Sequence, residues 1–243
     1  MRKLSFVLGV LVLVICVAVP LPRFDSGMPF SAHMVRHTAL LLLAAPMLAM
    51  AIPAGKFATD RLAALSRITA QFPFVAWLTG ILVMWAWHVP ALYNATAGVG
   101  TGILACAPLS PTLLPHGSAA HPAAVAALSI PWMSARAIPL LHDLSMLLAG
   151  FLFCWPVVTP FRAMRLPVLR GVLYLATACV CCSLLGLLIT FAPQGTYHGV
   201  GPEDQQTGGM IMWIPCCFVY LTASMVLLIR WLSGKEPATQ VSI

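Results

Sequence analysis

The chain of 243 residues is 60% hydrophobic and only 8% charged, and its mean hydropathy is +0.95. Soluble domains carry about 25% charged residues, so this composition excludes an ordinary soluble protein and indicates an integral membrane protein. The net charge of +7 is therefore first a signal of membrane topology. We expect the lipid bilayer, and no nucleic acid, among its partners.

Six apolar runs are long enough to cross a bilayer, which takes about 20 residues. We predict an all-α polytopic membrane helical bundle that forms a single integral membrane domain over residues 1–243. The expected spans lie at about 4–20, 29–52, 72–95, 138–158, 170–192 and 209–232. The first run also has features of a cleaved signal peptide, but its length and the proline that follows it favour a retained helix.

A long segment, residues 98–137, joins the third and fourth runs and is rich in Ala, Pro, Gly and Ser. Its five prolines interrupt any helix, so we expect an extracytoplasmic segment along the membrane surface, with a seventh span as the alternative. Ten of the thirteen Lys and Arg residues fall on one side of the membrane if the N-terminus is cytoplasmic, in agreement with the positive-inside rule. The exceptions are Arg23, Arg36 and Arg136.

All seven histidines then fall on the extracytoplasmic side. His33 and His37 are spaced i, i+4 and project from one stripe of the second span, and we expect His88 and His142 at the same depth on the third and fourth spans. Imidazole is a ligand that suits copper, so these four are candidate metal ligands. Interfacial histidines that hydrogen-bond to neighbouring helices are the alternative interpretation.

Sulfur ligands are weaker candidates, because methionine and free cysteine in a membrane helix most often pack as apolar residues. Thioethers at the depth of the histidines would favour Cu(I). They belong to Met34, Met210 and Met212. A thiolate site in mid-membrane is conceivable from Cys179, Cys182, Cys216 and Cys217.

Arg36 and Asp143 are the two charged residues placed deepest in the outer leaflet, on different spans. A buried charge needs a partner, so we predict that they pair or share a network that orients the histidines, with unaided snorkelling of Arg36 as the alternative. The outer loop before the sixth span is the most polar part of the chain, and it either caps that helix or contacts a partner. Its candidate residues are Glu203, Asp204, Gln205, Gly208 and Gly209.

Four blocks occur in the order HMVRH, WAWHVPALYNAT, HDLSMLLAGFLFCWPVV and EDQQTGGMIMWIP. Together they resemble the signature blocks of the CtaG family, and the resemblance covers the chain from Ser31 to Trp231. It implies a membrane assembly factor for caa-type cytochrome c oxidase in the bacterial plasma membrane, with oxidase subunits as partners. It carries over to His33, His37, His88, His142, Asp204, Gln205, Gly208 and Gly209.

The chain departs from the family pattern in three places. Some forty residues separate the blocks of His88 and His142, where the family has a short loop. Many members carry a second histidine close to the position of Asp143, and many are described with seven spans. A ligand is therefore missing or replaced in this chain if the family's site is a metal site.

The sequence contains no nucleophile with its base, no P-loop and no dinucleotide fingerprint, so we expect no enzyme. Our hypothesis is an oxidase assembly factor that handles or inserts copper at the extracytoplasmic side. The alternatives are a haem-binding electron-transfer protein with axial histidines, a metal-free scaffold for oxidase subunits, and a copper transporter.

Overall fold

The structure of the chain is a computed structural model that describes residues 2–18, 28–53, 60–96 and 137–234. Every regular element in this part of the chain is helical, which confirms the all-α prediction. The main helices are α1 (Arg2–Ala18), α2 (Pro29–Ala39), α3 (Ala45–Ala51), α4 (Asp60–Gln71), α5 (Pro73–His88), α8 (Ala137–Val158), α9 (Val168–Thr190) and α10 (Pro202–Leu232). Shorter helical pieces are the π-helix η1 (Leu40–Ala44), the 3-10 helix η3 (Arg162–Met164) and residues 90–96.

Four helices in the described ranges are long and apolar enough to cross a membrane, namely Pro29–Ala51, Ile138–Val158, Val168–Thr190 and Pro202–Leu232. A fifth candidate is the pair α4 and α5, which bend by 92° at their junction. Helix α1 is shorter, with 17 residues, and packs against α3. The count of six spans therefore stays a prediction, and most of the expected surface segment 98–137 lies outside the described residues.

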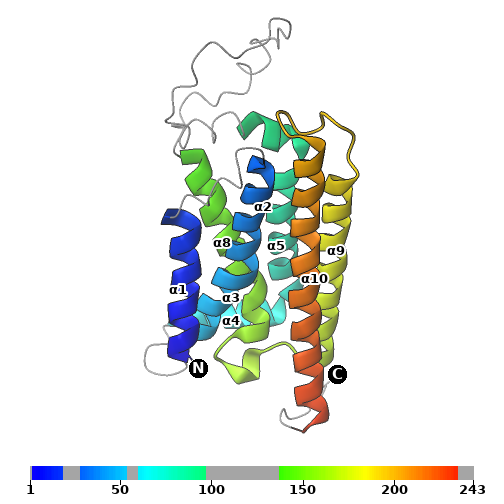
Figure 1. Cartoon of the computed structure of the whole chain (residues 1–243). Coiled ribbons are helices and arrows are strands. Elements are labelled where there is room, and N and C mark those ends of the chain that lie inside the picture. The colour runs from blue at the N-terminus through cyan, green and yellow to red at the C-terminus, as the bar shows by residue number, and fades with distance from the viewer. Residues whose placement is uncertain (1, 19–27, 54–59, 97–136, 235–243) are drawn as a thin grey trace, which may run out of the picture.

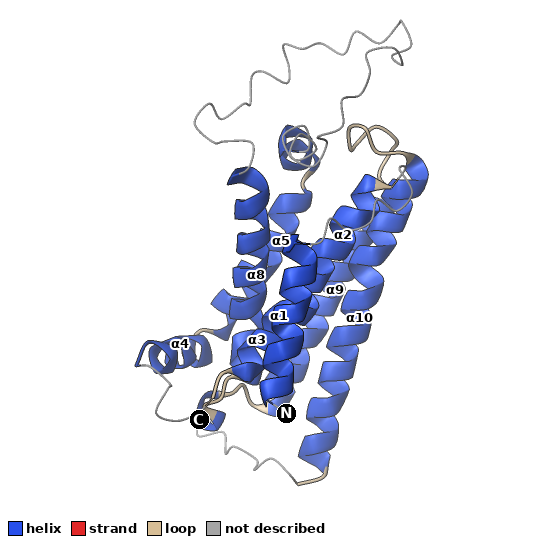
Figure 2. Ribbon diagram, turned by 60° about the vertical axis from the view of Figure 1, so that its left-hand side comes forward, coloured by secondary structure: helices blue, strands red, loops and turns tan. Residues whose placement is uncertain are grey.

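The long helices run side by side, and α1 begins at the same end of the bundle at which α10 ends (Figure 1). Helices α2, α8 and α10 begin at the opposite end, where α5 and α9 finish. Helix α4, bent by 92° from α5, lies beside the bundle near the end where α1 begins and α10 ends (Figure 2). This arrangement places the histidine-bearing ends of α2, α5 and α8 together.

The span Pro29–Ala51 is interrupted by the π-helix η1. Pro46 follows it and has no N–H to donate to a carbonyl one turn earlier, while the N–H of Ala45 reaches back to the carbonyl of Leu40. Widened turns of this kind let a helix absorb a proline and often occur beside functional sites. Here the widened turn begins three residues after His37.

The sixth predicted span begins earlier than expected. We predicted a start near residue 209, but α10 begins at Pro202, so Glu203, Asp204 and Gln205 belong to its first turn and not to a loop. Proline is well suited to the first position of a helix. Asp204 and Gln205 are also buried, because their side chains bond to neighbouring helices and not to water.

Candidate metal centre

Three histidines from two helices meet near the end of the bundle where α2 and α8 begin. The rings of His33 and His37 on α2 are 3.8 Å apart between centroids. His142 on α8 lies 4.1 Å from the His37 ring and 5.1 Å from the His33 ring. One ring nitrogen from each of the three lies within 4.8 Å of the others, so a single ion between them would touch all three.

His88 lies beside this group with partners of its own. Its ring is 5.4 Å from the His37 ring, but its Nδ1 is 2.5 Å from the carbonyl of Met84 and its Nε2 is 3.3 Å from Sδ of Met34. We predicted four histidines in one site, whereas the structure brings three close together and places His88 beside them. Among the three methionines predicted at this depth, Met34 contacts His88, Met212 packs in the hydrophobic core and Met210 is exposed on α10.

Three ring nitrogens of these histidines have no protein partner within the described part of the chain. Both ring nitrogens of His37 and Nε2 of His142 are buried and unbonded. A buried polar atom without a hydrogen bond costs about 1–3 kcal/mol. A metal ion bound to one nitrogen of each ring would remove part of that cost.

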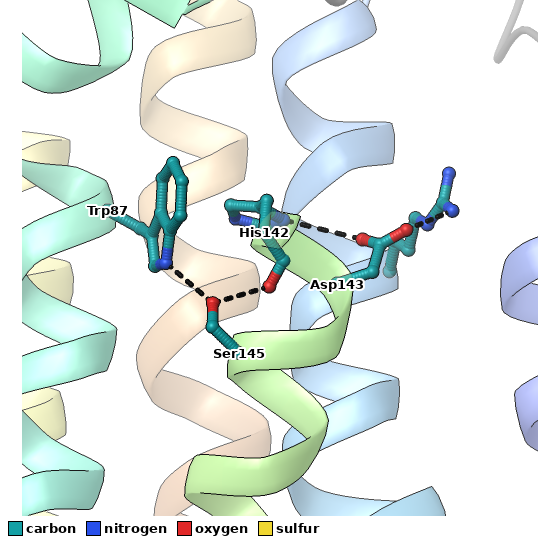
Figure 3. Close-up of polar contacts among 5 residues, drawn as sticks. Trp87, His142, Asp143 and Ser145 are labelled. Carbon is teal, nitrogen blue, oxygen red and sulfur yellow. Dashed lines mark hydrogen bonds and ion pairs between the residues drawn. The ribbon is translucent and has the colours of Figure 1, made fainter. Parts of the chain in front are cut away.

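Asp143 connects the centre to Arg36, as predicted. Its carboxylate accepts a hydrogen bond from the Arg36 guanidinium, and its other oxygen lies 3.3 Å from Nδ1 of His142 (Figure 3). This contact engages Nδ1 and leaves Nε2 of His142 for a ligand. The Arg36 side chain is 24% exposed and that of Asp143 is 12% exposed, so the pair is shielded from most of the solvent.

Two residues outside the predicted site, Trp87 and Ser145, contact His142 from its other side. The indole N–H of Trp87 donates to Oγ of Ser145 at 2.9 Å, and that hydroxyl donates to the backbone carbonyl of His142 at 2.8 Å (Figure 3). The Trp87 ring also packs edge-on against the His142 ring. In the sequence, only their positions connect these residues to the site, since Trp87 precedes His88 and Ser145 follows His142 by three residues.

Asp204 and Gln205 form hydrogen bonds with backbone groups at the ends of two other helices. The Asp204 carboxylate accepts from the N–H groups of Phe30 and Ser31 at 2.8 and 2.7 Å, so α10 caps the first turn of α2 from outside. The amide of Gln205 donates to the carbonyls of Ile189 and Ala192 at the end of α9. Both side chains therefore have structural roles, whereas Glu203 is exposed.

The two glycines of the same block allow helices to approach closely. A Cβ at Gly208 would overlap the ring of Phe30, and one at Gly209 would lie 2.8 Å from the backbone nitrogen of Thr190. Gly208 thus lets α10 pack on α2, and Gly209 lets it pack on α9. Together with Asp204, they fix the height and rotation of the helix that carries His33 and His37.

Tyr197 in the loop between α9 and α10 supports the neighbouring histidine. Its hydroxyl donates to the backbone carbonyl of His88 at 2.9 Å. Burial raises the pKa of Tyr197 above its ordinary value, so this hydroxyl stays protonated and remains a donor. His198, next in sequence, is exposed and lies apart from the centre.

Comparison with known proteins gives one family. The family model described as cytochrome c oxidase caa3 assembly factor (Caa3_CtaG) matches residues 1–105 and 124–234. No curated protein and no solved structure matches the chain. The matched ranges contain all four candidate histidines as well as Arg36 and Asp143.

Proposed function

Because the chain belongs to the family of cytochrome c oxidase caa3 assembly factors, we propose that it binds copper at His33, His37 and His142 and hands it to the oxidase. In this role copper is cargo and the protein is not an enzyme. Its partners are oxidase subunits in the bacterial plasma membrane. The same family match agrees with the four sequence blocks on which the resemblance rests.

The proposal rests on the convergence of three imidazoles whose ring nitrogens lie within 4.8 Å of one another. Imidazole suits copper and several other transition metals, and thioethers favour Cu(I). Sδ of Met34 lies against Nε2 of His88, so a soft donor of the kind that favours Cu(I) lies next to the centre. The unbonded nitrogens of His37 and His142 supply lone pairs that no protein donor occupies.

The delivery side follows from the ends of the bundle. The histidine centre lies at the end where α2 and α8 begin, opposite the start of α1 and the end of α10 (Figure 1), and that other end carries α4 and η3 with Arg61, Arg67 and Arg162. Positive residues concentrate on the cytoplasmic side of membrane proteins. The proposed centre therefore faces the extracytoplasmic surface.

The two main alternatives have less support. A haem with two axial histidines places its flat macrocycle between the rings, and rings 3.8–5.1 Å apart leave no space for it. A scaffold without metal would use the block around Asp204 to contact partners, but Asp204 and Gln205 are occupied within the fold. Copper binding, in contrast, would use ring nitrogens of His37 and His142 that have no hydrogen-bond partner among the described residues.

The test is the Cu(I) affinity of detergent-purified protein, measured by competition with a chromogenic chelator. We expect His33→Ala/His37→Ala and His142→Ala to lower the Cu(I) affinity of the histidine centre more than about 100-fold, since even residues that only support ligands change metal affinity by about 10–100-fold. His198→Ala is the matched control because this histidine is exposed and lies outside the centre. Equal affinity in all four proteins would overturn the proposal, and a haem band in the optical spectrum would favour the rival.

A further inference from the structure

Four cysteines face one another across the interface of α9 and α10. Cys179 and Cys182 lie one turn apart on α9, and Cys216 and Cys217 lie in the middle of α10. Sγ of Cys179 is 3.2 Å from Sγ of Cys217, and the thiols of Cys182 and Cys216 interact with each other. All four are free thiols.

Two of these thiols are fully buried next to a third sulfur. Cys182 and Cys216 are both 0% exposed, and the thiol of Cys182 points to Sδ of Met84 at 3.7 Å. Met84 comes from α5 and is 1% exposed. Cys182 therefore links soft ligand atoms from three helices, with Met84 on one side of it and Cys216 on the other.

This sulfur cluster, Met84, Cys182 and Cys216, is continuous with the histidine centre. Met84 lies one helical turn from His88, which is a rise of about 6 Å along the helix, and its carbonyl bonds to Nδ1 of His88. Nε2 of the same ring contacts Sδ of Met34, and the ring lies 5.4 Å from that of His37. Soft ligands thus follow one another from the histidine centre into the core.

We propose that Met84, Cys182 and Cys216 form a second Cu(I) site at the middle of the membrane. The inference rests on the proposed copper-handling function and extends it by a storage or transit position. Thiolate and thioether are the ligands that select Cu(I). Near-linear or trigonal coordination by two or three sulfurs needs no further residue.

The charge balance favours a site with one thiolate. Cu(I) carries one positive charge, and an uncompensated charge in the hydrocarbon region is costly. When one cysteine loses its thiol proton to solvent and the other stays neutral, the complex of Cu(I), thiolate, thiol and thioether has no net charge. Each Cu(I) that enters therefore releases one proton, and no electron is transferred.

The decisive measurement is X-ray absorption at the copper edge of full-length protein in detergent, loaded with Cu(I) under reducing conditions. We expect two copper ions per chain, one with nitrogen neighbours and one with sulfur neighbours. The His33→Ala/His37→Ala variant should keep the sulfur-bound ion and lose the other. The Cys182→Ala/Cys216→Ala variant should show the reverse.

Three further variants locate the site. Cys179→Ala/Cys217→Ala should keep the sulfur-bound copper, as should Cys154→Ala, whose buried thiol on α8 donates to the carbonyl of Phe151. Met84→Leu preserves the shape of the core, and it should weaken the sulfur-bound ion even if the double cysteine variant fails to fold. Wild-type protein with nitrogen-bound copper alone would overturn this inference and leave the histidine centre standing, whereas sulfur-bound copper alone would overturn the histidine centre.

Discussion

Asp143 is the charged residue that contacts a candidate ligand directly. It accepts from Arg36 and contacts Nδ1 of His142, so it positions the imidazole and balances the guanidinium. We expect Asp143→Asn to lower Cu(I) affinity about 10–100-fold, the range found when the partner of a ligating histidine is removed. It should also lower the thermal stability, because a partly buried Arg36 then lacks its counter-charge.

A double-mutant cycle separates these two effects. Thermal unfolding and chelator competition would be measured on Asp143→Asn, Arg36→Gln and the combined variant. In the combined variant the loss of stability should be smaller than the sum of the single losses, because no charge is left unpaired. Copper affinity should stay low, since His142 still lacks its carboxylate. Wild-type affinity in Asp143→Asn would show that the carboxylate does not position the ligand.

At the scale of elements, α2 depends on α10 for its first turn. The N–H groups at the start of a helix need acceptors, and Asp204 supplies two of them to Phe30 and Ser31. Asp204→Ala should lower the free energy of unfolding by about 2 kcal/mol, the upper end of the range for capping residues, because the capped groups are buried. Asp204→Asn keeps one acceptor and should lose less.

The control for this prediction is the neighbouring Glu203, which lies in the same turn of α10 but is exposed. Glu203→Ala should leave the thermal unfolding temperature in detergent nearly unchanged. The Asp204→Ala variant should also bind Cu(I) more weakly, because His33 lies one turn from the capped end. If Glu203→Ala and Asp204→Ala unfold at the same temperature, the cap does not stabilise α2.

At the scale of the whole molecule, the lengths of the apolar runs in the sequence determine the depth of a residue in the membrane but not the side of the helix on which it lies. Run length fixed the depth of His33, His37 and His142, and the structure brings these three together. Depth does not determine helix rotation, which here depends on close contacts such as that of Gly208 with Phe30. The sequence pattern therefore could not separate His88, whose nitrogens already have partners, from the other three.

Polar sequence led to a wrong loop prediction where the polar side chains bond to backbone groups of other helices. Residues 203–206 are charged or amide-bearing, and we predicted a loop there, but α10 begins at Pro202. Asp204 and Gln205 are buried because they satisfy backbone groups of α2 and α9. Such roles depend on pairs of elements far apart in the chain, so no local sequence pattern reveals them.

The orientation of the whole bundle decides on which side of the membrane the proposed copper centre lies. The start of α1 and the end of α10 lie opposite the starts of α2 and α8, which carry the three histidines (Figure 1), on the end where Arg61, Arg67 and Arg162 lie in α4 and η3. The positive-inside rule therefore predicts a cytoplasmic C-terminus and an extracytoplasmic loop between α9 and α10. We expect green fluorescent protein fused after Ile243 to fluoresce, and alkaline phosphatase fused after Gly195, in a truncated chain, to be active. Since phosphatase folds only outside the cytoplasm and the fluorescent protein folds inside it, the reversed result would place the histidine centre on the cytoplasmic side, where it could not serve an extracytoplasmic copper site of the oxidase.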